Sequence, residues 1–122
     1  MKTKAREQGD LAETQALAYF ERLGWKLIER NFLCRAGEVD LIMEDTKRTV
    51  VFVEVKYRKN SDYGLPQEFV LGKKLTRMSR AAMYYIRTKG FKNRNYRFDV
   101  AAAGPAGMEH IPNVLSFEGY TL

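Results

Sequence analysis

Three residues with chemically active side chains lie in two segments that are otherwise strongly apolar. Asp40 lies within residues 39–43, and Glu54 and Lys56 lie within residues 50–57. Side chains alternate between the two faces of a β-strand, so Glu54 and Lys56 should point the same way. Charged groups on an apolar surface are costly unless they pair with one another or with a ligand. Paired carboxylates suit Mg²⁺ or Mn²⁺, and such a cation activates water for attack on a phosphodiester. The simpler alternative is an ion pair of Lys56 with either acid.

The two segments are predicted to form a β-hairpin. Both are rich in β-branched residues, and the turn-prone residues 44–48 separate them. A three-residue loop at Thr46 to Arg48 would place Asp40 opposite Glu54, and such cross-strand neighbours lie about 5 Å apart. Three apolar residues of the second segment would then point to the other face, into a core: Val51, Val53 and Val55.

The remaining elements must hold this hairpin in place. Helices are predicted where apolar residues recur at helical spacing, and strands where β-branched and aromatic residues are dense. The predicted helices cover residues 3–23 and 66–89, and the predicted strands cover residues 25–29, 39–43, 50–57, 96–103 and 110–115. Residues 30–36, including Cys34, are predicted to form a loop. The order α-β-β-β-α-β-β indicates a mixed α/β fold, a central mixed sheet flanked by helices, in a single domain over residues 1–122.

The second predicted helix has a basic face. Its spacing places five residues on one side: Lys73, Arg77, Arg80, Tyr84 and Arg87. Apolar residues take the opposite side, which should pack on the sheet: Leu71, Leu75, Met78, Ala82 and Tyr85. Repeated cations along a helix suit a phosphate backbone, and an aromatic ring among them can stack on a base or sugar. The alternatives are a solvated face, or a helix lying on a membrane.

Composition narrows the class of protein. The net charge is +6, and residues 69–98 contain nine Lys or Arg and no Asp or Glu, which favours a polyanionic partner. A single cysteine excludes an internal disulfide, and a single histidine, His110, excludes zinc sites built from several His ligands. His110 is interpreted as structural.

With no signal peptide and no run of ~18 apolar residues, we expect a cytoplasmic protein with no membrane partner.

The pattern formed by Asp40, Glu54 and Lys56 resembles the Asp…(Asp/Glu)-x-Lys motif of the restriction-endonuclease-like, or PD-(D/E)xK, superfamily. The nearer resemblance is to the YraN-like family of bacterial proteins, and archaeal Holliday junction resolvases are more distantly similar. The resemblance extends through residues 9–20, 30–32, 37–42, 51–58 and 97–100, with Gly64, Lys73 and Ala82. Val39 stands where the superfamily motif has Pro, which is not a metal ligand.

The resemblance implies a restriction-endonuclease-like core and a role for each motif residue. Asp40 and Glu54 would hold the metal together with the Val55 carbonyl, and Lys56 would be the catalytic lysine. Such folds often carry a Glu on the first helix, which Glu13 matches, and a solvated helix position is the alternative for that residue. The implied activity is DNA endonuclease cleavage with Mg²⁺ or Mn²⁺. Branched or otherwise structured DNA is a candidate substrate, and a homodimer is a candidate assembly.

Other interpretations stay open beside an endonuclease. A non-catalytic nucleic-acid-binding module or a protein-interaction adaptor would retain the fold without cleavage. Asp99 is expected either to approach the site from a neighbouring strand or to pair with Arg97 or Arg30. Arg58 is expected either to contact phosphate or to pair with Glu38.

Overall fold

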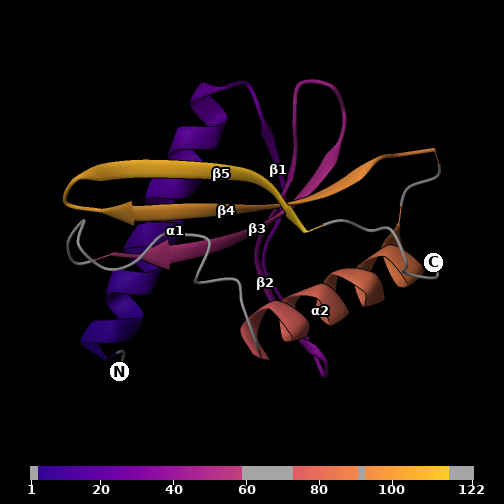
Figure 1. Ribbon diagram of the computed structural model, residues 1–122, viewed down its shortest axis with the longest axis horizontal. Helices are drawn as coiled ribbons and strands as arrows, with labels where there is room; N and C mark the ends of the chain where they lie inside the picture. The colour runs from indigo at the N-terminus through magenta and orange to yellow at the C-terminus, as the bar shows by residue number, and fades with distance from the viewer. Residues whose placement is uncertain (1–2, 59–72, 91–92, 116–122) are drawn as a thin grey trace.

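Two helices and a mixed five-stranded sheet make up the described part of the chain, residues 3–58, 73–90 and 93–115, in a computed structural model (Figure 1). The elements follow in the order α1 (Lys4–Arg22), β1 (Lys26–Cys34), β2 (Gly37–Glu44), β3 (Val50–Tyr57), α2 (Lys73–Lys89), β4 (Tyr96–Gly104) and β5 (Gly107–Leu115). The prediction of a mixed α/β protein with helices beside a central sheet is therefore confirmed.

The sheet keeps the chain order, with β1 to β5 lying side by side. Neighbouring strands are antiparallel except β3 and β4, which are parallel. Helix α2 lies in the connection between these two strands, as parallel neighbours require a crossover. The sheet is mixed because one pair of strands is connected through a helix and is parallel, whereas the other pairs are antiparallel.

Each face of the sheet packs against one helix (Figure 1). Helix α1 is capped by Thr3, whose side chain accepts a hydrogen bond from the Arg6 N–H at 3.1 Å. Its buried residues Ala12, Ala16 and Phe20 pack on Val51, Val53 and Val55 of β3. Helix α2 packs on the other face through four buried residues: Met78, Ala81, Ala82 and Tyr85. Strand β3 is therefore buried on both sides.

Strands β1, β2, β4 and β5 are all longer than predicted. Strand β1 continues to Cys34, so the prediction that residues 30–36 form a loop is wrong. The polar residues of this stretch and the left-handed backbone of Asn31 (φ 56°) hide the strand from sequence periodicity. Strand β5 begins at Gly107 and not at residue 110. The predicted start of the second helix at Pro66 and the loop around Gly64 lie outside the described residues.

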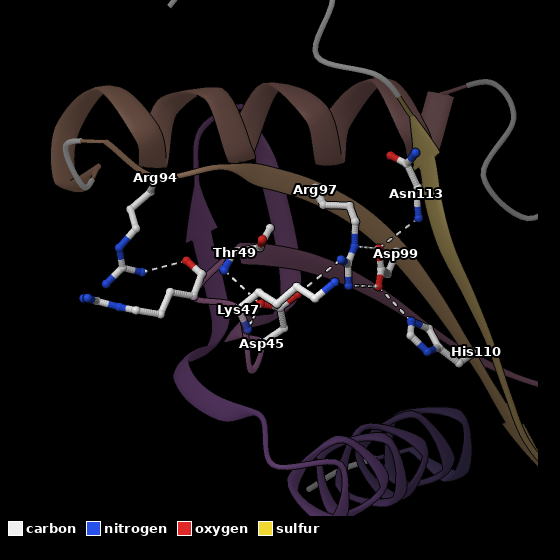
Figure 2. A network of polar contacts seen from close by, with 9 residues as sticks. Asp45, Lys47, Thr49, Arg94, Arg97, Asp99, His110 and Asn113 are labelled. Atoms are coloured by element: carbon white, nitrogen blue, oxygen red, sulfur yellow. Dashed lines mark hydrogen bonds and ion pairs between the residues drawn. The ribbon is translucent and has the colours of Figure 1, made fainter.

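A buried ionic network joins the β2–β3 hairpin to β4 and β5 (Figure 2). Asp99 is fully buried and accepts hydrogen bonds from the Arg97 guanidinium at 2.8 and 3.0 Å and from the Asn113 N–H at 3.0 Å, and it lies 2.7 Å from His110 Nε2. Arg97 also donates to Asp45 at 3.2 Å. Of the alternatives for Asp99, the pairing with Arg97 is thus confirmed.

The charge state of Asp99 follows from these contacts. Burial by itself would raise the pKa of this carboxyl, but the hydrogen bonds from His110, Arg97 and the Asn113 N–H outweigh burial and lower the pKa. Because the folded-state pKa is lowered, the network stabilises the protein above the usual Asp range and loses that contribution as pH falls through the folded pKa.

We expect Asp99→Asn to lower the free energy of unfolding at pH 7 by about 1–3 kcal/mol, because it removes the charge from a buried acceptor of Arg97 and the Asn113 N–H, while Arg97 keeps its contact with Asp45. The gap between wild type and variant should narrow as pH falls below the usual Asp pKa. Urea unfolding at a series of pH values measures both effects, with the exposed Glu21→Gln as control. A cost of Asp99→Asn no larger than that of the control would contradict this assignment.

Candidate metal centre and nucleic-acid interface

The β2–β3 hairpin has the register predicted from the sequence. Strand pairs run from Glu44↔Val50 to Leu41↔Val53, and the Asp45 N–H donates to the Thr49 carbonyl at 3.0 Å. A three-residue loop therefore lies between Asp45 and Thr49, as expected. Continuing this register by one position aligns Asp40 with Glu54, and this is where the regular pairing of the two strands ends.

Asp40 occupies the point where β2 and β3 separate. Figure 1 shows the start of β2 and the end of β3 running apart, and beyond Val53 strand β3 pairs only with β4. In place of a ladder contact, the Val55 N–H donates to Asp40 Oδ2 at 2.8 Å. The carboxylate is thereby held in the gap between the two strands, open toward both faces of the sheet.

Two grooves meet at Asp40. The α2-side groove is lined by Leu33, Gly37, Glu38, Asp40, Glu54, Arg77 and Met78. The α1-side groove includes Glu13, Asn31, Glu38, Asp40 and Val55 in its lining. Asp40 and Glu38 line both, so acidic residues from the two faces of the sheet converge at the gap. The structure thus brings Asp40 and Glu54 into one groove, and Asp40, Glu13 and Val55 into the other.

Glu13, Glu38 and Asp40 form an acidic cluster, with one carboxylate oxygen of each lying within 4.8 Å of the others. Glu38 is a candidate ligand that the sequence analysis missed. A signal was present, because Glu38 and Asp40 are two apart in a strand and alternation places them on the same side. Oxygen atoms at such a separation suit a hard divalent cation.

Arg30 holds Glu13 against the sheet. Its guanidinium donates to Glu13 Oε1 at 3.3 Å, and to the Asp10 carbonyl and Thr14 Oγ1 at 3.1 Å each. Burial raises the pKa of Glu13, while the hydrogen bond and charge of Arg30 and a hydrogen bond from Asn31 oppose that rise without cancelling it. Glu13 therefore reaches the sheet rather than lying on a solvated helix surface.

Glu54 and Lys56 share the α2 face of β3. Lys56 Nζ lies 3.3 Å from Glu54 Oε1, and the Glu54 side chain is 3% exposed. The ion pair considered as the simpler alternative is therefore present. It does not exclude the chemical role, because Glu54 also lines the groove that contains Asp40.

The basic face of α2 is solvent-exposed. Arg77, Arg80, Tyr84 and Arg87 are exposed, and Met78, Ala82 and Tyr85 are buried, as the helical spacing predicted. Lys73 begins α2, but its side chain lies outside the described residues, as do those of Leu71 and Leu75. The exposed Tyr84 ring stacks on Phe32 of β1 with 6.3 Å between the ring centroids. A positive surface beside an acidic groove is thus fixed to the sheet.

Arg58 follows β3 and takes a different partner from the one considered. Its Nη1 lies 3.2 Å from Glu109 Oε1 of β5. The pairing with Glu38 is therefore wrong, because Glu38 lies at the gap between β2 and β3 while Arg58 reaches the β4–β5 hairpin, where it lines a small pocket with residues 102–109.

Comparison with known proteins establishes the family. The profile described as "Uncharacterised protein family UPF0102" matches residues 12–103. The chain belongs to the UPF0102 family. A UPF0102 protein of Syntrophus aciditrophicus is 46% identical over 94 residues, 77% of this chain and 73% of the relative. One of Geobacter sulfurreducens is 44% identical over 110 residues (86% and 85%), and one of Moorella thermoacetica is 35% identical over 114 residues (93% and 94%).

The match spans the features described above. Residues 12–103 contain Glu13, Glu38, Asp40, the Glu54–Lys56 pair and the whole of α2, so the acidic residues of the two grooves lie in the part of the chain that matches UPF0102. Within the described residues, neither helix is both long enough and apolar enough to cross a membrane.

We expect three substitutions in the acidic cluster, Glu13→Gln, Glu38→Gln and Asp40→Asn, each to weaken Mn²⁺ binding at least about tenfold. Each one removes a charged oxygen that binds the cation or that holds a ligand in place. Isothermal titration with Mn²⁺ measures the change, and Glu21→Gln on the exposed side of α1 should bind as wild type does. Equal affinity in all four variants would show that the cluster holds no cation.

Proposed function

We propose that this UPF0102 protein is a metal-dependent phosphodiesterase of restriction-endonuclease-like architecture that cleaves DNA. The observation that carries the proposal is the place of Asp40, held by the Val55 N–H where β2 and β3 part. The acids Glu13 and Glu38 lie on one side of Asp40. Glu54 lies on the other side, and Lys56 forms an ion pair with Glu54.

The donor set fits a hard divalent cation. The ligand atoms offered are carboxylate oxygens of Asp40, Glu54, Glu13 and Glu38, with the Val55 carbonyl next to the hydrogen bond that fixes Asp40. Mg²⁺ and Mn²⁺ prefer such oxygens and need only one or two carboxylates, the remaining positions being filled by water and substrate phosphate. Among the described residues, neither Cys34 nor His110 lines either groove, and His110 Nε2 lies 2.7 Å from Asp99.

The reaction follows from the chemistry of these groups. A divalent cation, when bound, supplies Lewis acidity toward a phosphate oxygen. Lys56, which is partly buried beside Glu54, orients the attacking water or stabilises the negative charge that develops on the phosphate. The water oxygen forms a bond to phosphorus and gives up a proton, the bond to the leaving oxygen breaks, and the leaving oxygen takes up a proton from solvent.

The exposed face of α2 supplies the substrate interaction. Arg77, Arg80, Arg87 and Tyr84 project from one helix, and cations in such a row bind phosphates without reading the base sequence. This supports nucleic acid as the partner, and the substrate that we propose is DNA, with branched or structured DNA as a candidate. Assembly as a homodimer stays a prediction.

Lys56→Ala should lower the rate of Mn²⁺- or Mg²⁺-dependent DNA cleavage by about 10²–10³-fold, because it removes a charge positioned for the transition state. Binding should stay within about twofold of wild type. Cleavage is followed on labelled duplex, single-stranded and branched DNA, and Lys26→Ala on the exposed surface of β1 is the matched control.

Three outcomes separate the candidate functions. Metal-dependent cleavage that Lys56→Ala abolishes and Lys26→Ala preserves supports the nuclease. DNA that survives every metal yet binds with steep salt dependence indicates a non-catalytic binding module. DNA that neither binds nor is cleaved indicates an interaction adaptor.

A further inference from the structure

Arg77 differs from the other cations of α2 in where it lies. Among the described residues that line the α2-side groove, it is the only cation, and it shares that groove with Glu38, Asp40 and Glu54. Arg80 and Arg87 are exposed on the same helix, one and three turns further along, at about 4.5 and 15 Å of helix rise. From Arg77 onward, the basic face of α2 therefore leads away from the acidic groove.

Close contact between backbones fixes this position. Gly37, at the start of β2, has a φ of +154°, and a Cβ atom there would lie 2.6 Å from the Arg77 carbonyl oxygen and 2.9 Å from its carbonyl carbon. The next helix residue, Met78, is 2% exposed and packs into the core. The helix can approach the hairpin this closely only because residue 37 has no side chain. Arg77 is thus held on rigid elements, as an active-site group needs.

The charges of the groove give Arg77 a specific task. Carboxylates repel a phosphodiester, so a substrate phosphate enters only if positive charge compensates for them. A guanidinium is permanently charged and presents paired N–H donors that match two phosphate oxygens. A cation on the carboxylates and Arg77 beside them would approach the same phosphate from two sides.

We propose that Arg77 binds the phosphate that is cleaved, whereas Arg80 and Arg87 bind flanking phosphates. This inference rests on the proposed function, because it takes the groove of Asp40 and Glu54 as the cation site. Arg77 would contact the reacting phosphate directly, whereas Arg80 and Arg87 would contribute only to the affinity for DNA.

The test measures coupling between cation and arginine without requiring cleavage. DNA affinity is determined with and without Ca²⁺, which takes the same kind of oxygen ligands, for wild type, Arg77→Ala and the matched control Arg80→Ala. A phosphate that touches both the cation and Arg77 couples the two, and coupling of this kind is typically about 5–150-fold. We expect Ca²⁺ to tighten DNA binding to wild type and Arg80→Ala to a similar extent, and that gain to fall at least about fivefold in Arg77→Ala.

Equal Ca²⁺-dependent gains in the two arginine variants, or no gain in wild type, would overturn the inference. Failure of the proposed function looks different, since DNA would stay intact with Mg²⁺ and Mn²⁺ while the Arg77-specific coupling persists. Arg77→Lys, which keeps the charge but loses the paired donors, should recover only part of the gain. Gly37→Ala should lose the gain with all arginines present, provided that its melting curve shows a folded protein.

Discussion

The hydrogen bond from the Val55 N–H to Asp40 Oδ2 is the contact on which the candidate site depends. Two antiparallel strands normally satisfy their backbone groups with each other, and a gap between them leaves donors that need another partner. Here the side chain of Asp40 takes that place at the first position after Leu41↔Val53. One carboxylate therefore lies where the strand pairing ends and is held by a backbone hydrogen bond at the opening between two faces of the sheet.

Elements on both faces then deliver charged groups to this opening. On the α1 face, Arg30 clamps the helix through Glu13, the Asp10 carbonyl and Thr14, so Glu13 is presented to the cluster. On the α2 face, the contact of Gly37 with the Arg77 backbone presents a cation instead. The buried network around Asp99 holds the far end of the same hairpin to β4 and β5. Acidic and basic groups thus face one opening from positions that packing fixes.

Sequence periodicity predicts the features of the site that depend on regular spacing along a strand or helix. It misses the contacts that depend on irregular segments or on residues far apart in the chain. The register of the β2–β3 hairpin and the faces of β3 and α2 follow from alternating and helical spacing, so the grouping of Asp40 with Glu54 and the exposure of Arg77 could be predicted. The role of Arg30 could not, because β1 is an edge strand with a left-handed residue and a register shift, which breaks its periodicity. The contact between Gly37 and Arg77 joins segments far apart in the chain, and no local pattern encodes it.

Anomalous diffraction from crystals grown with Mn²⁺ tests most directly whether the parting of β2 and β3 creates a cation site. The account predicts a manganese peak bonded to the Asp40 carboxylate, with a second carboxylate of the two grooves completing the protein ligands. Manganese bound elsewhere on the protein, with the Asp40 position empty and its hydrogen bond to Val55 unchanged, would contradict it.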